Sequence, residues 1–447
     1  MRLSVGTGSA SAAAPAPPRP WRRALLWLAL LGPFFFASYG FANGWASTRA
    51  QVPVVVFGWE AGMPFVPWTI VPYWSIDIFY AVSLLLCRQR LELDRHALRL
   101  LSAQLIAVAC FLLWPLRFSF TRPETEGVFG WLFDVLLGFD KPFNQAPSLH
   151  IVLLVVLWVK FAQYLQGIWR WLLHGWALLI GVSVLTTYQH HFIDVPTGAL
   201  VGWLCVWLWP EQGTPPLRAW QWHGDGQRWR LAGCYLLGAV ALLLPAAVFG
   251  GVALWLLWPV VSALLVALAY AGLGQAVFQK RDDGRLSMAA RWLLAPYLAA
   301  AWLNSRLWTR RAPQPVPVAA DVWLDRMPAR RLPAPLVAVV DTCAELSCTV
   351  AAPAYAGVPM LDLVVPSPAQ LVEAAEAIER LRRHGPVLVC CALGYSRSAA
   401  SVAVWLLRSG QAATLDAALA QLRAARPEVV LGPGHLAAIA VAAGVRS

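Results

Sequence analysis

Near the C-terminus, a short apolar segment runs into a cysteine that an arginine follows six residues later. Residues 387–391 are typical of a buried strand, and the loop 392–396 leads from Cys391 to Arg397, Ser398 and an apolar helix. Such a turn presents backbone N–H groups and a helix N-terminus to one anion. Arg397 can add two parallel hydrogen bonds, and the positive field favours the thiolate of Cys391, the nucleophilic form. The pattern predicts cysteine-dependent hydrolysis of phosphate esters.

The alternative is that Cys391 is only a buried structural residue at a strand–turn–helix corner. The apolar strand before it and the apolar helix after it favour the catalytic interpretation, as do Gly394 and Ser398. The backbone groups expected to cradle the phosphate belong to the loop residues Ala392, Leu393, Gly394, Tyr395 and Ser396.

These residues resemble the signature of the dual-specificity branch of the cysteine-dependent protein tyrosine phosphatases, over roughly residues 316–445. The resemblance implies a general acid on an upstream loop. Residues 360–367 look like that loop, with Asp362 at the matching position to protonate the leaving oxygen. It also implies that Ser398 stabilises the departing thiolate. The family usually has a histidine directly before the nucleophile, whereas this chain has Cys390, which we expect to be a core residue or a redox partner.

The rest of the chain has the composition of a membrane protein, with 59% hydrophobic and 13% charged residues. Apolar runs of bilayer length recur along it. They predict eight spans, near residues 24–43, 65–87, 97–116, 147–166, 169–186, 195–210, 231–249 and 252–278. Two further segments, 128–138 and 286–304, are ambiguous between spans and interfacial helices.

Basic residues predict the orientation of these spans. Arginines precede the first span and lie between spans two and three, and between six and seven, and Lys280 and two arginines follow span eight. All of them fall on one side, which the positive-inside rule makes cytoplasmic. A catalytic thiolate survives best in that reducing compartment. We therefore expect a multi-pass protein, in a bacterial inner membrane given the excess of arginine over lysine, with a cytoplasmic C-terminal domain.

Polar residues at the ends of the expected spans form a second group that could do chemistry. Arg122 follows span three, Ser148 and His150 begin span four, and His190 and Asp194 lie between spans five and six. Placing an ionisable residue at the end of a membrane span costs free energy, so such a residue usually has a function. Four residues separate His190 from Asp194, so on a helix they would share a face and the carboxylate could orient the imidazole.

This second group resembles the type-2 phosphatidic acid phosphatase superfamily, over roughly residues 60–210. The resemblance implies that His190 is the nucleophile and that Asp194 orients it. His150 would protonate the leaving group, and Arg122 and Ser148 would bind the phosphate. Where the family has a lysine and an arginine, this chain has Pro115 and Val184. The segment 183–190 looks closer to the inositol phosphorylceramide synthase branch, which transfers head groups between lipids.

The expected fold is a multi-span α-helical membrane domain followed by a C-terminal α/β domain with a mainly parallel sheet. Residues 1–20 are expected to be disordered and 21–210 to form a six-span lipid-phosphatase-like domain. Residues 211–312 would add two spans, a basic interfacial helix and the start of a stiff linker over 312–317, and 313–447 would form the phosphatase-like domain. In the phosphatase-like domain, residues 335–341 and 386–390 are expected to form buried parallel strands. Helices are expected over 368–384, 398–409, 414–425 and 434–444.

The resulting hypothesis is a bifunctional membrane phosphatase. It would hydrolyse lipid phosphates through His190 outside the cytoplasm and phosphate monoesters of lipids or proteins through Cys391 inside. One alternative is a lipid head-group transferase with a regulatory phosphatase domain. Another is a non-catalytic phosphate-binding module, which the presence of nucleophile, arginine and acid disfavours. No cofactor, metal ion or nucleic-acid partner is expected, because the spacing of cysteine and histidine does not suggest zinc and the arginines are dispersed among loops.

Overall fold

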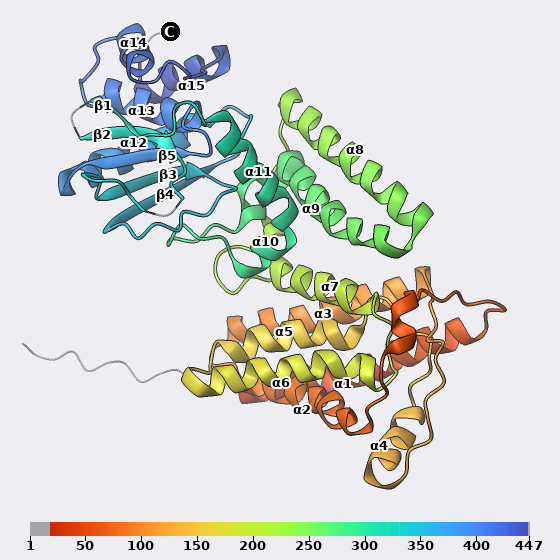
Figure 1. Cartoon of the computed structure of the whole chain (residues 1–447). Coiled ribbons are helices and arrows are strands. Elements are labelled where there is room, and N and C mark those ends of the chain that lie inside the picture. Colours follow the sequence, from red (N-terminus) through yellow and green to blue (C-terminus); the bar gives the residue numbers. More distant parts are fainter. Residues whose placement is uncertain (1–17, 320, 330, 446–447) are drawn as a thin grey trace, which may run out of the picture. The chain divides into compact units, whose positions relative to one another are not determined.

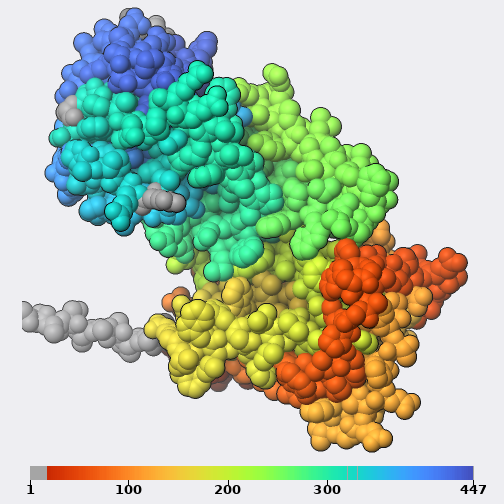
Figure 2. All heavy atoms as spheres, in the orientation of Figure 1, coloured from red at the N-terminus to blue at the C-terminus, as the bar shows by residue number. Residues whose placement is uncertain are grey.

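The computed structural model describes residues 18–319, 321–329 and 331–445. Residues 1–17, most of the expected disordered tail, lie outside the described part. The chain divides into two compact units, one ending at Cys205 and one beginning at Val206. Figures 1 and 2 colour the first unit from red to yellow-green and the second from green to blue.

The first unit is entirely helical. Two short 3-10 helices, η1 and η2, follow the first long helix. The elements are α1 (Trp21–Ser47), η1 (Gly58–Gly62), η2 (Pro67–Thr69), α2 (Ile70–Leu86), α3 (Arg90–Leu113), α4 (Gly127–Leu137), α5 (Leu149–Ala162), α6 (Gly167–Thr186) and α7 (Asp194–Leu208), whose last turn enters the second unit.

Six helices of the described chain are long and apolar enough to cross a membrane, which makes this a multi-pass membrane protein. They are Trp21–Ser47, Pro67–Leu86, Arg90–Leu113, Gly167–Thr186, Gly226–Phe249 and Gly251–Phe278. The other two expected spans coincide with shorter apolar helices, α5 of 14 residues and α7 of 15. The expectation of 20 residues near 147–166 was too long, because the helix begins only after the Ser148 cap and ends beside the buried Lys160.

The second unit begins with a helical part. It comprises η3 (Pro216–Ala219), α8 (Gly226–Phe249), η4 (Gly251–Leu256), α9 (Leu257–Leu268), the π-helical turn η5 (Ala269–Leu273), η6 (Gly274–Phe278), α10 (Met288–Leu293) and α11 (Ala295–Trp308). The ambiguous segment 286–304 is thus two helices, and neither is among the six long apolar ones.

A five-stranded sheet with helices packed against it completes the second unit. The strands are β1 (Val316–Ala319), β2 (Val322–Arg326), β3 (Ala338–Cys343), β4 (Ala354–Met360) and β5 (Val387–Cys391), in the spatial order β1-β2-β5-β3-β4. Only β1 runs antiparallel to its neighbour; β2, β5, β3 and β4 are parallel. The helices are α12 (Pro368–Leu381), η7 (Arg382–His384), α13 (Arg397–Arg408), α14 (Leu415–Ala425) and α15 (Pro433–Ala443).

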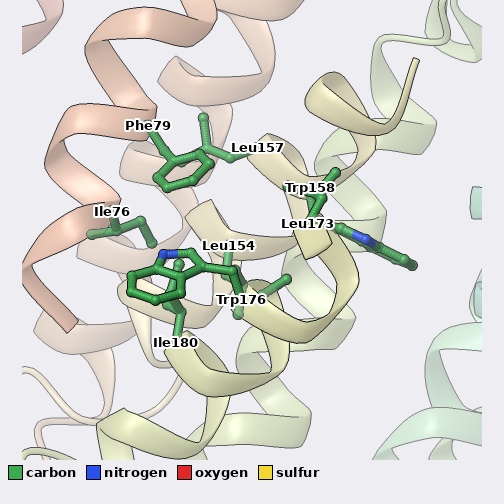
Figure 3. Close-up of a pocket in the computed structure, with 9 residues that line it drawn as sticks. Ile76, Phe79, Leu154, Leu157, Trp158, Leu173, Trp176 and Ile180 are labelled. Carbon is green, nitrogen blue, oxygen red and sulfur yellow. The ribbon is translucent and has the colours of Figure 1, made fainter. Parts of the chain in front are cut away.

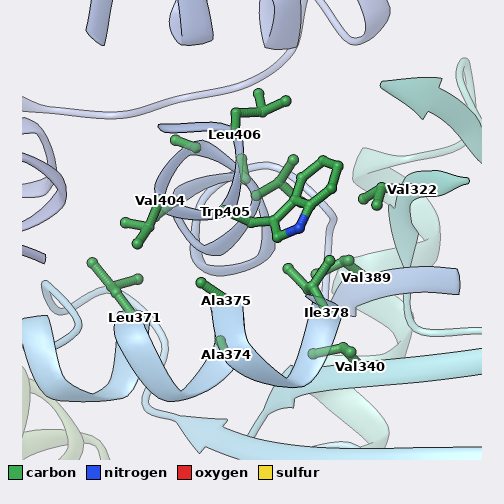
Figure 4. Close-up of a cluster of buried hydrophobic side chains, with 14 of the residues drawn as sticks. Val322, Val340, Leu371, Ala374, Ala375, Ile378, Val389, Val404, Trp405 and Leu406 are labelled. Atoms are coloured by element: carbon green, nitrogen blue, oxygen red, sulfur yellow. The ribbon is translucent and has the colours of Figure 1, made fainter. Parts of the chain in front are cut away.

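The central strands β3 and β5 are buried throughout, as parallel strands covered on both faces require. β5 is apolar along its whole length, whereas β3 is apolar except for the buried Asp341 and Thr342. Figure 4 shows Trp405 of α13 among side chains of α12 and the sheet, including Ile378 and Val389. This core fixes α12 and α13 against the sheet, and so fixes the turn between β5 and α13.

The expected parallel strands and the four expected helices are present in this unit. One feature was wrong: the stiff linker proposed to end at residue 317 overlaps β1, which starts at Val316 and pairs with Leu324 of β2. Proline is tolerated there because β1 is an edge strand.

Candidate functional site

The turn from β5 into α13 brings the predicted cysteine-site residues together. The thiol sulfur of Cys391 accepts hydrogen bonds from the Gly394 N–H and the Ser398 hydroxyl, each at 3.2 Å. Gly394 has φ +78°, and a Cβ there would lie 2.5 Å from the carbonyl carbon of Asp325. Only glycine fits this position, because both the backbone conformation and the space exclude a side chain. The loop is therefore a tight cradle with the sulfur at its base.

Arg397, at the end of this cradle, is held by a carboxylate that the sequence interpretation missed. Its Nη1 and Nη2 atoms donate to the two oxygens of Glu345 at 2.8 and 2.7 Å, and Nη1 also donates to the Met360 carbonyl at 2.9 Å. Both side chains of the pair are buried, at 2% and 3% exposure. The Nε atom of Arg397 is buried and has no protein partner among the described residues. That nitrogen is available to a phosphate oxygen.

The predicted acid, Asp362, lies next to Arg397. Its Oδ1 atom is 3.0 Å from the Nη2 atom of Arg397, and its side chain retains 30% of its surface exposed. Burial raises the pKa of the Asp362 carboxyl, as does the charge of Glu345, while the charge of Arg397 opposes the rise. A carboxyl with a raised pKa holds its proton at higher pH, as a general acid requires.

Cys390, which stands where the related phosphatases have histidine, is a core residue. Successive residues of a strand face opposite sides of the sheet, and Cys390 packs with Leu388, Val339 and Cys343 in a buried cluster. Burial raises the pKa of the Cys390 thiol well above its ordinary value. Cys390 and Cys391 are both free cysteines. The arrangement favours the core interpretation of Cys390 over the redox one.

In the first unit, the predicted pair of His190 and Asp194 is formed. The Nδ1 atom of His190 lies 3.1 Å from Oδ2 of Asp194, and both side chains are buried. The premise of a shared helix face was wrong, however, because α7 begins only at Asp194 and His190 lies in the turn before it. The carboxylate also accepts the backbone N–H of His191 at 3.1 Å, which closes that turn.

The other predicted residues of the membrane unit border this turn. The Nε atom of Arg122 donates to the Thr187 carbonyl at 3.1 Å, so the guanidinium is tied to the segment that leads to His190. Ser148 is fully buried, and its backbone N–H donates to the Asp194 carbonyl at 3.0 Å. His150 lies two residues after Ser148, in the first turn of α5. Four of the five predicted residues are therefore linked at this turn, and His150 begins the adjacent helix.

Two residues that the sequence interpretation missed support this group. Glu60 accepts from the ring of His191 at 3.0 Å and from the Phe192 N–H at 2.9 Å. The ring of Tyr73 stacks on that of His150 with centroids 4.0 Å apart. No local signal reveals Glu60, which is 131 residues from His191. The contact nevertheless separates the roles of the two adjacent histidines, because His191 is bound to Glu60 and His190 to Asp194.

A pocket elsewhere in the first unit does not carry chemistry. Figure 3 shows its lining of aliphatic and aromatic side chains from α2, α5 and α6. They are Ile76, Phe79, Leu154, Leu157, Trp158, Leu173, Trp176, Ala177 and Ile180. Within the described part of the chain, no three histidine, cysteine or acidic side chains lie together in a way that could hold a metal ion.

The parallel sheet, the cysteine cradle and its arginine define a cysteine-dependent phosphatase domain. Residues 338–442 match the family model described as "Dual specificity phosphatase, catalytic domain", and residues 96–215 match "PAP2 superfamily". The chain therefore combines a PAP2-superfamily domain with a dual specificity phosphatase catalytic domain, in a multi-pass membrane protein. It is a phosphoric monoester hydrolase.

Solved structures similar to this chain include human DUSP28, at 25% identity and a TM-score of 0.27, covering 29% of this chain and 95% of that one. The structure titled Tk-PTP in the active form is 23% identical with a TM-score of 0.24, and the match covers 30% of this chain and 98% of that one. A search of the curated proteins found none that matches.

Proposed function

We propose that the chain carries two phosphatase sites with different nucleophiles, one at Cys391 and one at His190. At the first, the thiolate of Cys391 attacks phosphorus, and Asp362 gives its proton to the leaving oxygen. Water then attacks the phosphocysteine with Asp362 as base, which releases phosphate and restores the thiolate. The observation that carries this proposal is the Cys391 sulfur with two donors at 3.2 Å, in a turn whose Arg397 has a buried Nε atom without a protein partner among the described residues.

Ser398 and Glu345 have supporting roles in this mechanism. The hydroxyl of Ser398 donates to the Cys391 sulfur, so it stabilises the thiolate both before attack and when sulfur departs. Glu345 fixes the guanidinium plane of Arg397 by the bidentate pair. When phosphate binds, the Nε–Nη2 edge of Arg397 donates to it, and Asp362 releases Nη2 to face the leaving group.

At the second site, His190 attacks phosphorus through the nitrogen that does not face Asp194. The Nδ1 contact to Asp194 keeps a proton on Nδ1, so that Nε2 carries the lone pair. His150 protonates the leaving oxygen, and Arg122 and Ser148 bind the phosphate. Water then hydrolyses the phosphohistidine and restores the imidazole.

We propose that the two sites face opposite sides of a bacterial inner membrane, with Cys391 in the cytoplasm. The support is the distribution of arginine in the short loops, together with the need of a thiolate for a reducing compartment. Gln411 is exposed, so a cysteine at this position tests the orientation. Gln411→Cys should label with an impermeant thiol reagent only after the cells are opened; labelling of intact cells would contradict this orientation.

A transferase reaction at His190 is the second candidate for that site. Val184, which stands where the related phosphatases have arginine, is buried and accepts the His190 N–H through its carbonyl. It supplies no guanidinium to hold a phosphate for attack by water. Formation of a new phospholipid when diacylglycerol is added, at the expense of free phosphate, would favour the transferase.

The purified full chain in detergent tests the two-site proposal. Phosphate release is measured from an aryl phosphate and from phosphatidic acid, for the unchanged chain, Cys391→Ser, His190→Ala and the double variant. Cys391→Ser should abolish aryl phosphate hydrolysis and His190→Ala should leave it intact. If Cys391→Ser keeps full activity on the aryl ester, the cysteine site is not a phosphatase site.

A further inference from the structure

The loops that form the Cys391 site are all hydrogen-bonded to the helical part of the same unit. The buried hydroxyl of Ser305, on α11, donates to the Ala392 carbonyl in the phosphate cradle at 2.5 Å. The hydroxyl of Tyr270, on η5, donates to the backbone carbonyl of Asp362 at 3.2 Å. The catalytic cysteine, acid and arginine are therefore built on a framework that includes residues 226–309.

Lys280, which directly follows the second long apolar helix of this part, makes the third connection. Its ammonium is 2.5 Å from Oδ2 of Asp341 and donates to the Leu346 carbonyl at 2.8 Å, next to Glu345. Both members of the ion pair are buried, at 4% and 0% exposure. Breaking such a buried pair is costly, so this connection is a fixed part of the unit.

The framework contains two of the six helices suited to crossing a membrane, Gly226–Phe249 and Gly251–Phe278. Large apolar side chains point outward from them without protein cover. Among them are Leu237 at 70% exposure, Val248 at 73%, Phe249 at 78% and Val252 at 78%. An apolar surface of this kind is stable only in lipid, so the hairpin of α8 and α9 places the framework at a bilayer.

Packed tyrosines connect this hairpin to the catalytic loops. Tyr235 of α8 stacks on Tyr270 with ring centroids 5.7 Å apart, and the Tyr235 ring is 5.9 Å from that of Tyr297 of α11. Tyr270 is buried, and its hydroxyl contacts the backbone of Asp362. The general acid is therefore held by the same helices that carry the exposed apolar surface.

The first turn of α8 sets the height of the site above the hydrocarbon. The side-chain amide of Gln227 donates to the Leu363 carbonyl at 2.5 Å. The apolar run expected to cross the bilayer begins at residue 231, four residues after Gln227, which at 1.5 Å per residue is about 6 Å along the helix. That distance is within the roughly 5–8 Å thickness of one head-group layer. The rim beside the acid is also apolar, since Leu363 is 58% exposed.

We propose that the substrate of the Cys391 site is a phosphate monoester on the head group of a membrane lipid. Its acyl chains would remain in the bilayer beside α8 and α9 while the phosphate enters the cradle. This inference rests on the proposed cysteine chemistry and adds the substrate class to it. A lipid is favoured over a phosphoprotein because the catalytic loops are fixed to the membrane hairpin and the rim at Leu363 is apolar.

The test compares long-chain lipids with water-soluble compounds that carry the same reacting group. The full chain carries His190→Ala, which inactivates the His190 site. It is incorporated into nanodiscs so that both faces of the bilayer are accessible. The substrates are dioleoyl phosphatidic acid against glycerol 3-phosphate, and a long-chain phosphatidylinositol monophosphate against its deacylated head group. A phosphotyrosine peptide represents proteins, and an aryl phosphate reports on the cysteine chemistry itself.

For at least one lipid, kcat/KM should exceed that of its own soluble head group by about 100-fold or more, equivalent to about 2.7 kcal/mol. Cys391→Ser should abolish this turnover. The proposal is overturned if the aryl phosphate is hydrolysed but neither lipid is preferred over its head group, or if the peptide exceeds both lipids. Loss of aryl phosphate hydrolysis as well would instead contradict the proposed function of the site.

Discussion

The ion pair between Arg397 and Glu345 offers the sharpest test of how the cysteine site is organised. Glu345→Gln keeps the shape of the side chain and one hydrogen-bond acceptor but removes its charge. In the unchanged chain, burial opposes ionisation of Glu345, but the charge and hydrogen bonds of Arg397 outweigh it and hold its pKa below the usual range. The variant should therefore leave a buried guanidinium short of its main partner.

The size of the effect follows from the geometry. Both partners are nearly fully buried and share two hydrogen bonds of 2.7 and 2.8 Å. Removing one member of such a pair costs about 3–5 kcal/mol. Met360 and Asp362 still hold Arg397, so we expect a free-energy cost at the lower end of this range, about 3 kcal/mol. Part of this cost lowers the free energy of unfolding, and the rest raises the barrier of the catalysed reaction. At 1.4 kcal/mol per factor of ten, kcat/KM should fall by about 10- to 100-fold.

The dependence of kcat/KM on pH distinguishes a role of Glu345 in positioning the site from a purely structural role. Glu345 contributes to the raised pKa of Asp362, and Arg397 opposes it. Without the Glu345 charge, and with Arg397 free to turn toward Asp362, the pKa of Asp362 should fall. The proton needed by the leaving group is then lost at lower pH, so the alkaline limb of the alkyl phosphate profile should move to lower pH.

The assay measures kcat/KM against pH, together with the free energy of unfolding in denaturant. Glu376→Gln is the matched control, because Glu376 pairs with Arg408 on the surface at 3.6 Å, with the two side chains 62% and 41% exposed. Such a pair contributes about 0–1 kcal/mol, so the control should behave as the unchanged chain. Wild-type kcat/KM and an unmoved pH profile in Glu345→Gln would refute the positioning role.

Four further outcomes follow from the two sites. Asp362→Asn should slow alkyl phosphates by about 100-fold or more and good aryl leaving groups much less, because only a poor leaving group needs the proton; equal losses on both would indicate a structural carboxylate. Arg397→Lys should not restore activity, since a point charge cannot replace the planar fork; wild-type kcat/KM would remove the bidentate contact from the mechanism. Gly394→Ala should abolish aryl phosphate hydrolysis, since the new Cβ would meet the Asp325 backbone at 2.5 Å; retained activity would show that the cradle tolerates rearrangement. His190→Ala should abolish phosphatidic acid turnover in a Cys391→Ser background, and Asp194→Asn should lower it less, because the carboxylate orients the ring and closes the turn but does not attack phosphorus; turnover unchanged by His190→Ala would exclude His190 as the nucleophile.

The parts of the fold that the sequence predicts are those determined by local chemistry. The apolar runs of β3 and β5 indicate buried parallel strands, and the helices expected over 368–384 and 414–425 correspond to α12 and α14. Cys391, Gly394 and Arg397 are recognisable because one continuous turn carries them all. The antiparallel strand β1 was missed, because prolines on either side of Val316 are typical of a linker.

The supporting residues could not be predicted because the fold brings them from distant positions. Glu345 is 52 residues from Arg397, Ser305 is 87 from Ala392, and Tyr270 is 92 from Asp362. A buried glutamate or serine has no sequence signal of its own, since its partner is defined only when the strands and helices pack. The sequence also could not show that His190 lies in a turn and not on a helix, because that turn depends on the Asp194 carboxylate.

Trapping the phosphorylated intermediates identifies the nucleophile of each site. The full chain is mixed rapidly with radiolabelled aryl phosphate or phosphatidic acid, quenched, and mapped by peptide mass spectrometry. Phosphocysteine withstands acid, whereas phosphohistidine is lost in acid and survives base. We expect an acid-stable label on Cys391 with the aryl ester and an acid-labile label on His190 with phosphatidic acid. Label on His191, or lipid turnover without any acid-labile label, would contradict the histidine assignment. An acid-stable label absent from Cys391 during aryl phosphate turnover would contradict the cysteine assignment.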